Sequence, residues 1–175
     1  EDAWWGAQTQ RALENFNISP HRIPVGFLKA LSLVKRAAAA VNMELKVISP
    51  EVSALIQEAA LMIENGEYSD QFPLDVFQTG SGTSWNMNIN EVIANIANAK
   101  AGNGKGSRSP VHPNDHVNRG QSSNDVIPTA MNISVRLAAG RLGKALCELS
   151  EGLSVKAVEF SGIPKIGRTH LQDAV

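Results

Sequence analysis

The chain contains little of what would link it to a disulfide framework, a membrane or a nucleic acid. Among its 175 residues there is one cysteine, Cys147, which excludes a disulfide framework and a cysteine metal site. The longest apolar run is far shorter than the ~20 residues that a membrane span requires. The formal net charge is −1, so nothing indicates a nucleic acid or an anionic membrane surface as a partner. What remains is a globular chain with 43 % apolar residues, enough for the core of one domain or slightly more.

Two further features of the sequence indicate where the protein is located and whether the chain is part of a longer one. No stretch resembles a secretory signal, so we expect a reducing compartment, which is the cytoplasm, or the mitochondrial matrix in a eukaryote. The sequence starts in a segment with Trp4 and Trp5 and stops at Val175 without a helix end. We therefore expect the chain to be part of a longer protein.

Helical periodicity predicts an all-α fold. Apolar residues recur every three or four positions over 25–45 and 51–63, and again from about 89 to about 100. The second of these helices is predicted to start at the N-cap Ser49, with Pro50 at its first position, and to end at Asn65 and Gly66. A fourth helix is predicted to begin at Pro128 and to continue for about 30 residues, a length typical of helix bundles. Residues 1–26 show no clean period and are predicted to form an irregular arm. No stretch alternates with period two, so no strand is expected.

Polar residues gather in three turns, over residues 78–88, 107–129 and 166–175. Each turn offers small neutral donors with few lysines and no cysteine nucleophile. Such groups suit the stabilisation of a small carboxylate whose negative charge grows in the transition state. Removal of a proton beside a carboxylate, followed by loss of a leaving group, is one reaction of this kind. The plainer alternative is that the turns are helix caps, because Ser, Asn and Asp are also the residues that caps and turns prefer.

Short motifs within these turns narrow the choice. The Gly80–Gly82 turn lacks the third glycine of a dinucleotide fingerprint, because Trp85 stands there and no apolar strand precedes it. A glycine turn before a helix N-terminus suits an anion instead. His112 and His116 have the spacing of a zinc pair, but Pro113 separates them and the expected glutamate is absent, so no metal site is predicted.

Four segments then point to a known family. They are WGAQTQRALENF (5–16), QTGSGTSWNMNINEVIANIA (78–97), HPNDHVNRGQSSNDVIPTAM (112–131) and GRTHLQDA (167–174). In order and spacing they resemble the N-terminal part of class II fumarases, of the fumarase/aspartase superfamily. The resemblance covers nearly the whole chain. It implies a mostly helical fold in which residues 1–121 form an N-terminal domain and residues 122–175 begin a central helix bundle.

The resemblance also implies an activity and its partners. Members of the family add water reversibly to fumarate to give L-malate, with no metal or organic cofactor. They form homotetramers in which three subunits build each active site. The expected partners are therefore small dicarboxylates, fumarate and L-malate, and further copies of the chain.

Site residues follow position by position from the same resemblance. The substrate site would comprise Ser81, Gly82, Thr83, Ser122, Ser123, Asn124 and Thr169. His170 is similar to the catalytic histidine of the family, which activates the water or protonates the departing hydroxyl. A second site near the entrance, called the entrance site below, would comprise His112, Pro113, Asn114 and Asp115. The arginine that often precedes it falls at Ser109, with Arg108 beside it.

Other interpretations stay open at this point. The family's mobile serine loop, a lysine, an asparagine and the glutamate that pairs with the histidine would all lie beyond Val175. We therefore expect this chain alone to lack useful hydratase activity and to self-associate. One alternative is a sister lyase of the aspartase or argininosuccinate type, although the turn from Thr79 to Thr83 is more similar to fumarases than to aspartases. The other is a truncated, non-catalytic paralogue that binds dicarboxylates or assembles with intact subunits.

Overall fold

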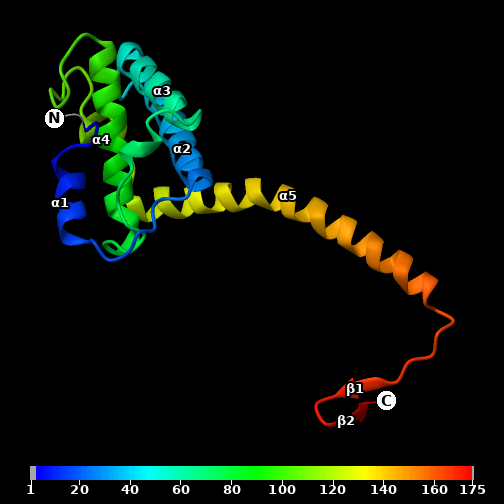
Figure 1. The fold of residues 1–175 in the computed structure, drawn as a ribbon. Coiled ribbons are helices and arrows are strands. Elements are labelled where there is room, and N and C mark those ends of the chain that lie inside the picture. Colours follow the sequence, from blue (N-terminus) through cyan, green and yellow to red (C-terminus); the bar gives the residue numbers. More distant parts are fainter. Residues whose placement is uncertain (1–2, 175) are drawn as a thin grey trace. The chain divides into compact units, whose positions relative to one another are not determined.

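The computed structural model describes residues 3–174 and is mainly helical (Figure 1), which confirms the predicted all-α class. The five long helices are α1 (Ala7–Asn15), α2 (Val25–Glu44), α3 (Pro50–Glu64), α4 (Thr83–Lys100) and α5 (Ser123–Glu159). Three short helices are η1 (Ser69–Gln71), η2 (Gly80–Gly82) and the π-helix η3 (Pro113–Val117). Two strands, β1 (Gly167–Thr169) and β2 (Gln172–Ala174), form an antiparallel hairpin. The chain divides into two compact units, one up to Val135 and one from Arg136 onward.

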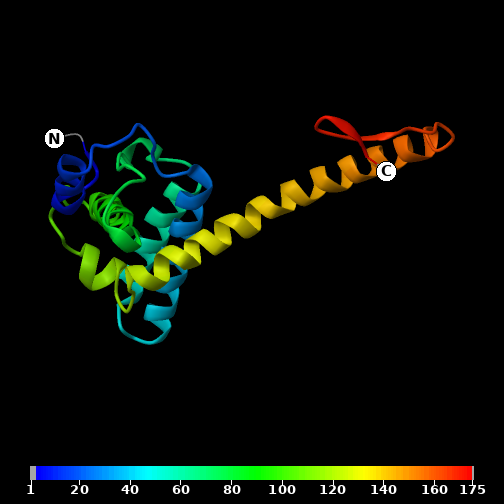
Figure 2. The same cartoon turned by 90° about the horizontal axis from the view of Figure 1, so that it is seen from below.

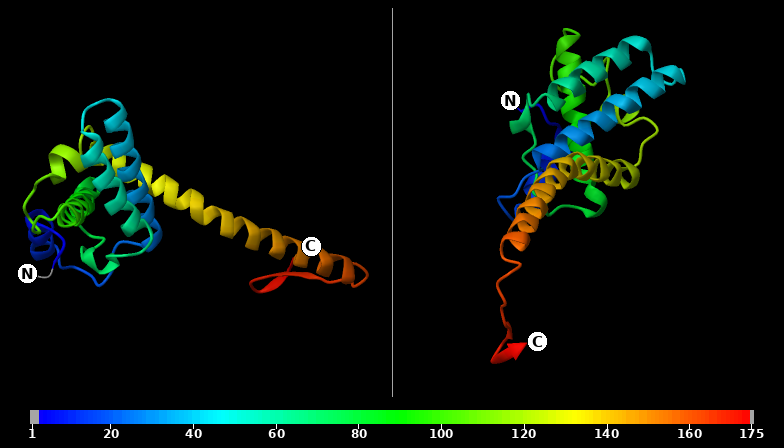
Figure 3. Two further views of the ribbon diagram at one scale, coloured as in Figure 1. Left: turned by 90° about the horizontal axis from the view of Figure 1, so that it is seen from above. Right: turned by 90° about the vertical axis from the view of Figure 1, so that its right-hand side faces the viewer.

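Helix α4 is the centre of the first unit. It lies between α1 on one side and the α2–α3 pair on the other (Figures 1 and 2), and α2 and α3 run side by side (Figure 3). The apolar face predicted for this helix is buried, with Ile89, Val92, Ile93, Ile96 and Ala97 each at most 1 % exposed. Leu31 of α2 and Ile56 and Ile63 of α3 belong to the same core. Two of the three polar turns, over residues 78–88 and 107–129, lie in the same unit as this core.

Helices α2 and α3 begin and end close to where local signals predict. Ser49 caps α3 by accepting a hydrogen bond from the Val52 amide at 3.3 Å, with Pro50 at the first helical position. The helix ends at Glu64, before Asn65 and Gly66. These signals lie within α3 or directly beside it, so the sequence alone was sufficient to predict where this helix begins and ends.

The prediction of an irregular arm over residues 1–26 is wrong in part, because α1 lies within it. This helix has no side-chain cap of its own at Gly6. The carboxylate of Glu91 on α4 caps it instead, accepting from the amides of Gly6 and Gln8 at 2.9 Å and from the Thr9 amide at 3.1 Å. A Cβ at Gly6 would lie 2.8 Å from this carboxylate. A cap supplied from more than 80 residues away leaves no local signal near α1.

Two other helix starts differ from the prediction. Helix α4 begins at Thr83, earlier than the apolar stripe indicates, because its first turns contain buried Asn86 and Asn88. The Asn88 side chain is accommodated there by donating to the Gln71 carbonyl at 3.1 Å. Helix α5 begins at Ser123 and contains Pro128 inside it. Because proline lacks an N–H, Pro128 donates no hydrogen bond to the carbonyl four residues earlier. Prolines therefore usually stand at the start of a helix, which is why the sequence indicated a start at Pro128.

The second unit contains the rest of α5 and the hairpin. The strands were not predicted, because three residues are too few to show an alternating pattern, and the described β1 side chains are all exposed. The apolar stripe on this part of α5 is exposed as well: Leu137, Leu142, Leu146, Leu149 and Leu153 each expose at least 55 % of their surface. Among the described residues, no helix combines the length and apolarity needed to cross a membrane.

Candidate functional site

Two of the three predicted polar turns meet within the first unit. Thr83 opens α4 and Ser123 opens α5, and their hydroxyl oxygens lie 3.1 Å apart, within hydrogen-bond distance. Ser81 and Gly82 belong to η2, which directly precedes Thr83. Ser122 and Asn124 flank Ser123 in the sequence. We call residues 81–83 and 122–124 together the polar corner. The structure thus brings together six of the seven residues predicted to bind substrate.

The close approach of the two helix starts depends on Gly82. Its φ is 63°, in the left-handed region that favours glycine. A Cβ at this position would lie 3.1 Å from two side-chain carbons of Ile127 on α5. Ser81 has the same φ of 63° without being glycine, and such backbone outliers often occur at functional sites.

The polar corner has the properties of an anion site. The N-terminus of α4 follows Gly82 without a side-chain cap, and the N-terminus of α5 lies beside it. Helix N-termini present N–H groups and a partial positive charge, and the hydroxyls of Thr83 and Ser123 add neutral donors. Thr83 and Asn124 are exposed, so the corner opens to the outside of the unit.

Behind the corner, side chains fix the turn before α4. The Gln78 side chain accepts from the Trp85 amide at 2.9 Å, and Thr79 and Ser84 share a hydrogen bond at 3.1 Å. The Trp85 ring packs on Phe27 of α2, with ring centroids 5.3 Å apart. The bulky Trp85 side chain in the first turn of α4 is therefore accommodated on the α2 side of the core.

The third predicted turn lies in the second unit. Thr169 ends β1, and His170 is in the turn that leads to β2. Both residues are exposed, and neighbouring Leu171 exposes 98 % of its surface.

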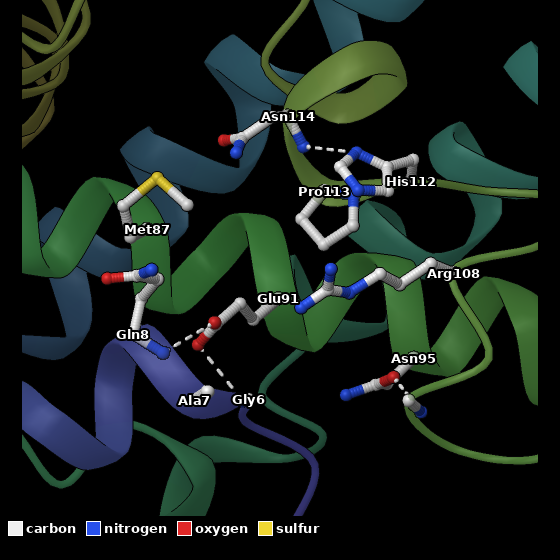
Figure 4. A pocket seen from close by; sticks show the side chains of 11 residues that line it. Gly6, Ala7, Gln8, Met87, Glu91, Asn95, Arg108, His112, Pro113 and Asn114 are labelled. Carbon is white, nitrogen blue, oxygen red and sulfur yellow. Dashed lines mark hydrogen bonds between the residues drawn. The ribbon is translucent and has the colours of Figure 1, made fainter.

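The predicted entrance-site residues line a cavity of about 360 Å³ in the first unit, with the exception of Asp115 (Figure 4). Its lining includes His112, Pro113 and Asn114, together with Gln8, Glu91, Asn95 and Arg108. Figure 4 shows the Arg108 side chain pointing into the cavity toward Glu91. The Glu91 carboxylate itself accepts hydrogen bonds from α1. Of the two neighbouring positions, Arg108 lines this cavity and Ser109 is not among its lining residues.

The ring of His112 is held by its own backbone neighbourhood. Its Nδ1 accepts from the amides of Asn114 at 3.3 Å and Asp115 at 3.2 Å, as a cap for η3. The Asp115 carboxylate lies 3.2 Å from the same Nδ1, and it forms an ion pair only when the ring is protonated.

His116 is held differently from His112. Its Nδ1 accepts from the His112 amide at 2.9 Å. Burial lowers the pKa of His116, with smaller opposing and reinforcing effects of Asp115, His112 and Arg119. Within the described part of the chain, no group of three or more His, Cys, Asp or Glu residues is arranged to hold a metal ion.

Sequence reasoning missed Glu91 and Arg108 as lining residues of the cavity. Glu91 had a signal in the sequence, since it is the one acidic residue in α4 and lies within its apolar stripe; the structure shows it buried, at 6 % exposure. An acid in such a position needs partners, and the donors of α1 are those partners. For Arg108 the signal in the sequence was its position next to Ser109, where the resemblance expects an arginine.

Comparison with known proteins gives one family and a consistent set of relatives. The family model described as Lyase matches residues 1–175. The chain is 54 % identical over 175 residues to "Fumarate hydratase class II 1" of Pseudomonas aeruginosa, which covers 99 % of this chain and 38 % of the relative. It is 56 % identical over 173 residues to "Fumarate hydratase class II" of Nitrosomonas europaea, which covers 98 % of this chain and 37 % of the relative.

Solved structures agree with these relatives. The fumarate lyase:delta crystallin of Brucella melitensis has a TM-score of 0.90 at 44 % identity, over 99 % of this chain and 38 % of that one. The recombinant class II fumarase of Schistosoma mansoni has a TM-score of 0.90 at 43 % identity, over 99 % of this chain and 37 % of that one. The chain thus spans somewhat over a third of the length of the proteins it matches.

Proposed function

The chain belongs to the lyase family whose model spans residues 1–175, and from this premise we propose that the full-length protein catalyses the reversible hydration of fumarate to L-malate. The observation that carries the proposal is the contact between Thr83 and Ser123, which brings two helix N-termini side by side. Helix N-termini favour anions, which supports an anion site at this corner. The names of the relatives, which are class II fumarate hydratases, support the choice of substrate.

In this proposal the polar corner binds one carboxylate of the substrate. Ser81, Gly82 and Thr83 approach it from the start of α4, and Ser122, Ser123 and Asn124 from the start of α5. Neutral donors aimed at the carboxylate stabilise the second negative charge that develops when the adjacent carbon loses its proton. Thr169 completes the binding set, and His170 activates water in one direction and protonates the departing hydroxyl in the other. These roles require neither a metal nor an organic cofactor.

The entrance site would hold a second dicarboxylate before it reaches the corner. His112, Pro113 and Asn114 line the cavity, and Arg108 supplies the positive charge. Asp115 acts through His112, whose Nδ1 it contacts.

Oligomerisation belongs to the same proposal. The leucine stripe of α5 is exposed over the second unit, and an apolar stripe of that length normally packs against other helices. We propose that copies of the chain cover it in a tetramer located in the cytoplasm, with residues 1–121 as an N-terminal domain and residues 122–175 starting the bundle. The 175-residue chain alone is then inactive and self-associates, and hydration of fumarate by this chain that depends on His170 would contradict this.

An assay of the full-length protein tests the reaction. Fumarate is supplied in water and then with ammonia, and formation of L-malate but not aspartate is expected. Replacement Ser123→Ala should raise KM for fumarate by about 10-fold, as expected for loss of a hydrogen bond to a charged ligand. The control is Ser154→Ala, also on α5, whose hydroxyl donates only to the Ser150 carbonyl. Aspartate as the main product would assign the protein to the ammonia-lyases, and the absence of both products would favour a non-catalytic paralogue.

A further inference from the structure

Lys35 of α2 is a buried lysine without an acidic partner. It is 0 % exposed, whereas lysine is almost never fully buried unless it is paired. Its Nζ donates to Asn118 Oδ1 at 3.1 Å and to Gln121 Oε1 at 2.9 Å. Both acceptors are neutral amides, and within residues 3–174 Lys35 takes part in no ion pair.

The two acceptors belong to the turn that leads directly into the polar corner. The Asn118 side chain also accepts from Asn86 Nδ2 on α4 at 3.1 Å and donates to the Gln121 carbonyl at 3.2 Å. The Gln121 side chain donates to the Val117 carbonyl at 2.8 Å. The Lys35 amine therefore links three parts of the fold, namely α2, the first turn of α4 and the turn of residues 118–121.

We propose that Lys35 is a positioning residue for the polar corner, which holds the turn of residues 118–121 so that Ser122, Ser123 and Asn124 face Thr83. This inference rests on the proposed function for the meaning of the corner, but the geometry it describes does not. Ser122 follows Gln121 directly, and its carbonyl accepts from the amides of Asp125 and Val126 in the first turn of α5 at 3.1 and 3.0 Å. A shift of the turn would therefore move the start of α5.

A purely structural role explains the arrangement less well. Burial of an amine is unfavourable, and an apolar side chain of similar length would fill the same space at lower cost. Here both hydrogen bonds of the amine go to the one turn that precedes the corner. Burial also lowers the pKa of Lys35 to about 7, and the neutral amine has two N–H donors for these two acceptors.

The test replaces Lys35 in the full-length protein. Lys35→Met keeps the length of the side chain and removes the donors. We expect KM for fumarate to rise about 10-fold with a much smaller change in kcat, because a displaced corner weakens binding of the carboxylate. Hydrogen exchange of the amides of residues 118–126 should accelerate by about 10-fold, while exchange in the middle of α4 stays unchanged.

Two further variants keep the test decisive. Ser32→Ala is the matched control, since Ser32 is buried on the same helix and its hydroxyl donates to the Leu28 carbonyl of that helix. If Lys35→Met does not fold, Gln121→Met removes one acceptor from a half-buried position, and the same two measurements apply with the same expected direction.

The outcomes separate this inference from the proposed function. If the wild-type protein converts fumarate neither with water nor with ammonia, the proposed function fails and hydrogen exchange alone decides the positioning role. Exchange over residues 118–126 that equals that of Ser32→Ala would overturn the inference. So would an increase spread equally over α4, or a fall in kcat at unchanged KM.

Discussion

The polar corner and the β1–β2 hairpin carry two parts of one proposed site, and they are held in different ways. The corner lies at the starts of two helices that share a buried core, with Gly82 in contact distance of Ile127 and Lys35 behind the turn of residues 118–121. The hairpin consists of two three-residue strands, and its turn residue His170 is exposed. The corner is therefore formed by the packing of the first unit. The residues of the hairpin that the proposal assigns to catalysis, Thr169 and His170, are exposed within their own unit. The proposed activity therefore needs the assembled protein.

The strongest way to sharpen this comparison is to remove the imidazole from the hairpin. In the full-length protein, His170→Ala should lower kcat for malate dehydration by about 10²- to 10⁴-fold, the usual contribution of a general acid or base. The stability of the first unit should not change, because the residue belongs to the exposed hairpin. Steady-state kinetics and a thermal melt measure the two effects.

A second exposed histidine provides the control for that measurement. His21→Ala removes an imidazole from the first unit, where only the backbone amide of His21 donates a hydrogen bond, to Ser19. Its kcat should equal that of the wild type. An equal loss in both variants would remove the special role of His170.

Gly82→Ala tests whether the corner is held by packing. A non-glycine residue in the left-handed region costs roughly 1–2 kcal/mol, and contact of the new Cβ with Ile127 adds overpacking of about 1–3 kcal/mol. We expect a lower melting temperature and a higher KM for fumarate in the full-length protein. Gly66→Ala is the matched control, because Gly66 also has positive φ, at 97°, but no atom lies within 4 Å of its added Cβ. Equal effects of the two substitutions would show that strain, and not the contact with α5, matters at Gly82.

A smaller effect is expected in the unit that contains the polar corner, where the stability should depend on pH through Lys35. Burial lowers the pKa of Lys35 from 10.5 to about 7, so between these values the unfolded chain binds more protons than the folded one. The free energy of unfolding should therefore rise with pH across this range, by on the order of 1 kcal/mol per pH unit. Below about pH 7 both states are protonated, and the cost of burying the charge is present in full.

Denaturant unfolding of the wild type and Lys35→Met at about pH 7 and pH 9 measures this contribution. The stability difference between the two proteins should shift in favour of the wild type at the higher pH. Ser32→Ala should keep the slope of the wild type. Parallel pH profiles for the wild type and Lys35→Met would mean that Lys35 remains charged in the fold.

Local signals were sufficient for part of the fold. The N-cap at Ser49 and the stop at Asn65 and Gly66 predicted α3, and the apolar period predicted α2, because both kinds of signal lie within the segments they describe. Helix α1 escaped prediction because its cap is Glu91, which is distant in sequence. The hairpin escaped it because strands of three exposed residues have no burial pattern.

The candidate site residues were named from motifs, but the geometry that brings them together could not be predicted. The residues of the polar corner were named by resemblance, while the contact between Thr83 and Ser123 depends on how α4 and α5 pack. Lys35 occupies an ordinary position in the apolar pattern of α2, so no local feature marks it as buried and bonded to Asn118 and Gln121. Arg108 likewise lines the cavity because of the path that the folded chain takes, and no local sequence feature predicts this.

The smallest expected effect concerns the anchor of the segment that leads to η2. Asp75 is buried, and although burial raises its pKa, hydrogen bonds from Phe77, Ser19 and Ile18 outweigh this and lower the pKa to about 2. Since the unfolded value is 3.8, this stabilisation is present above about pH 4 and is lost as the pH falls through about 2.

Asp75→Asn should therefore lower the melting temperature at neutral pH, because the amide replaces a carboxylate that only accepts hydrogen bonds. The difference from the wild type should narrow as the pH falls from about 4 to about 2, since protonation of Asp75 removes the same advantage. Circular dichroism melts of both proteins over this range measure the effect. The hairpin provides the contrast, because Gln172→Ala at the exposed first residue of β2 should give a difference that does not vary with pH. A constant gap for Asp75→Asn would show that the bonds to Ser19 and Phe77 do not depend on the charge, and that the corner is anchored from this side by packing alone.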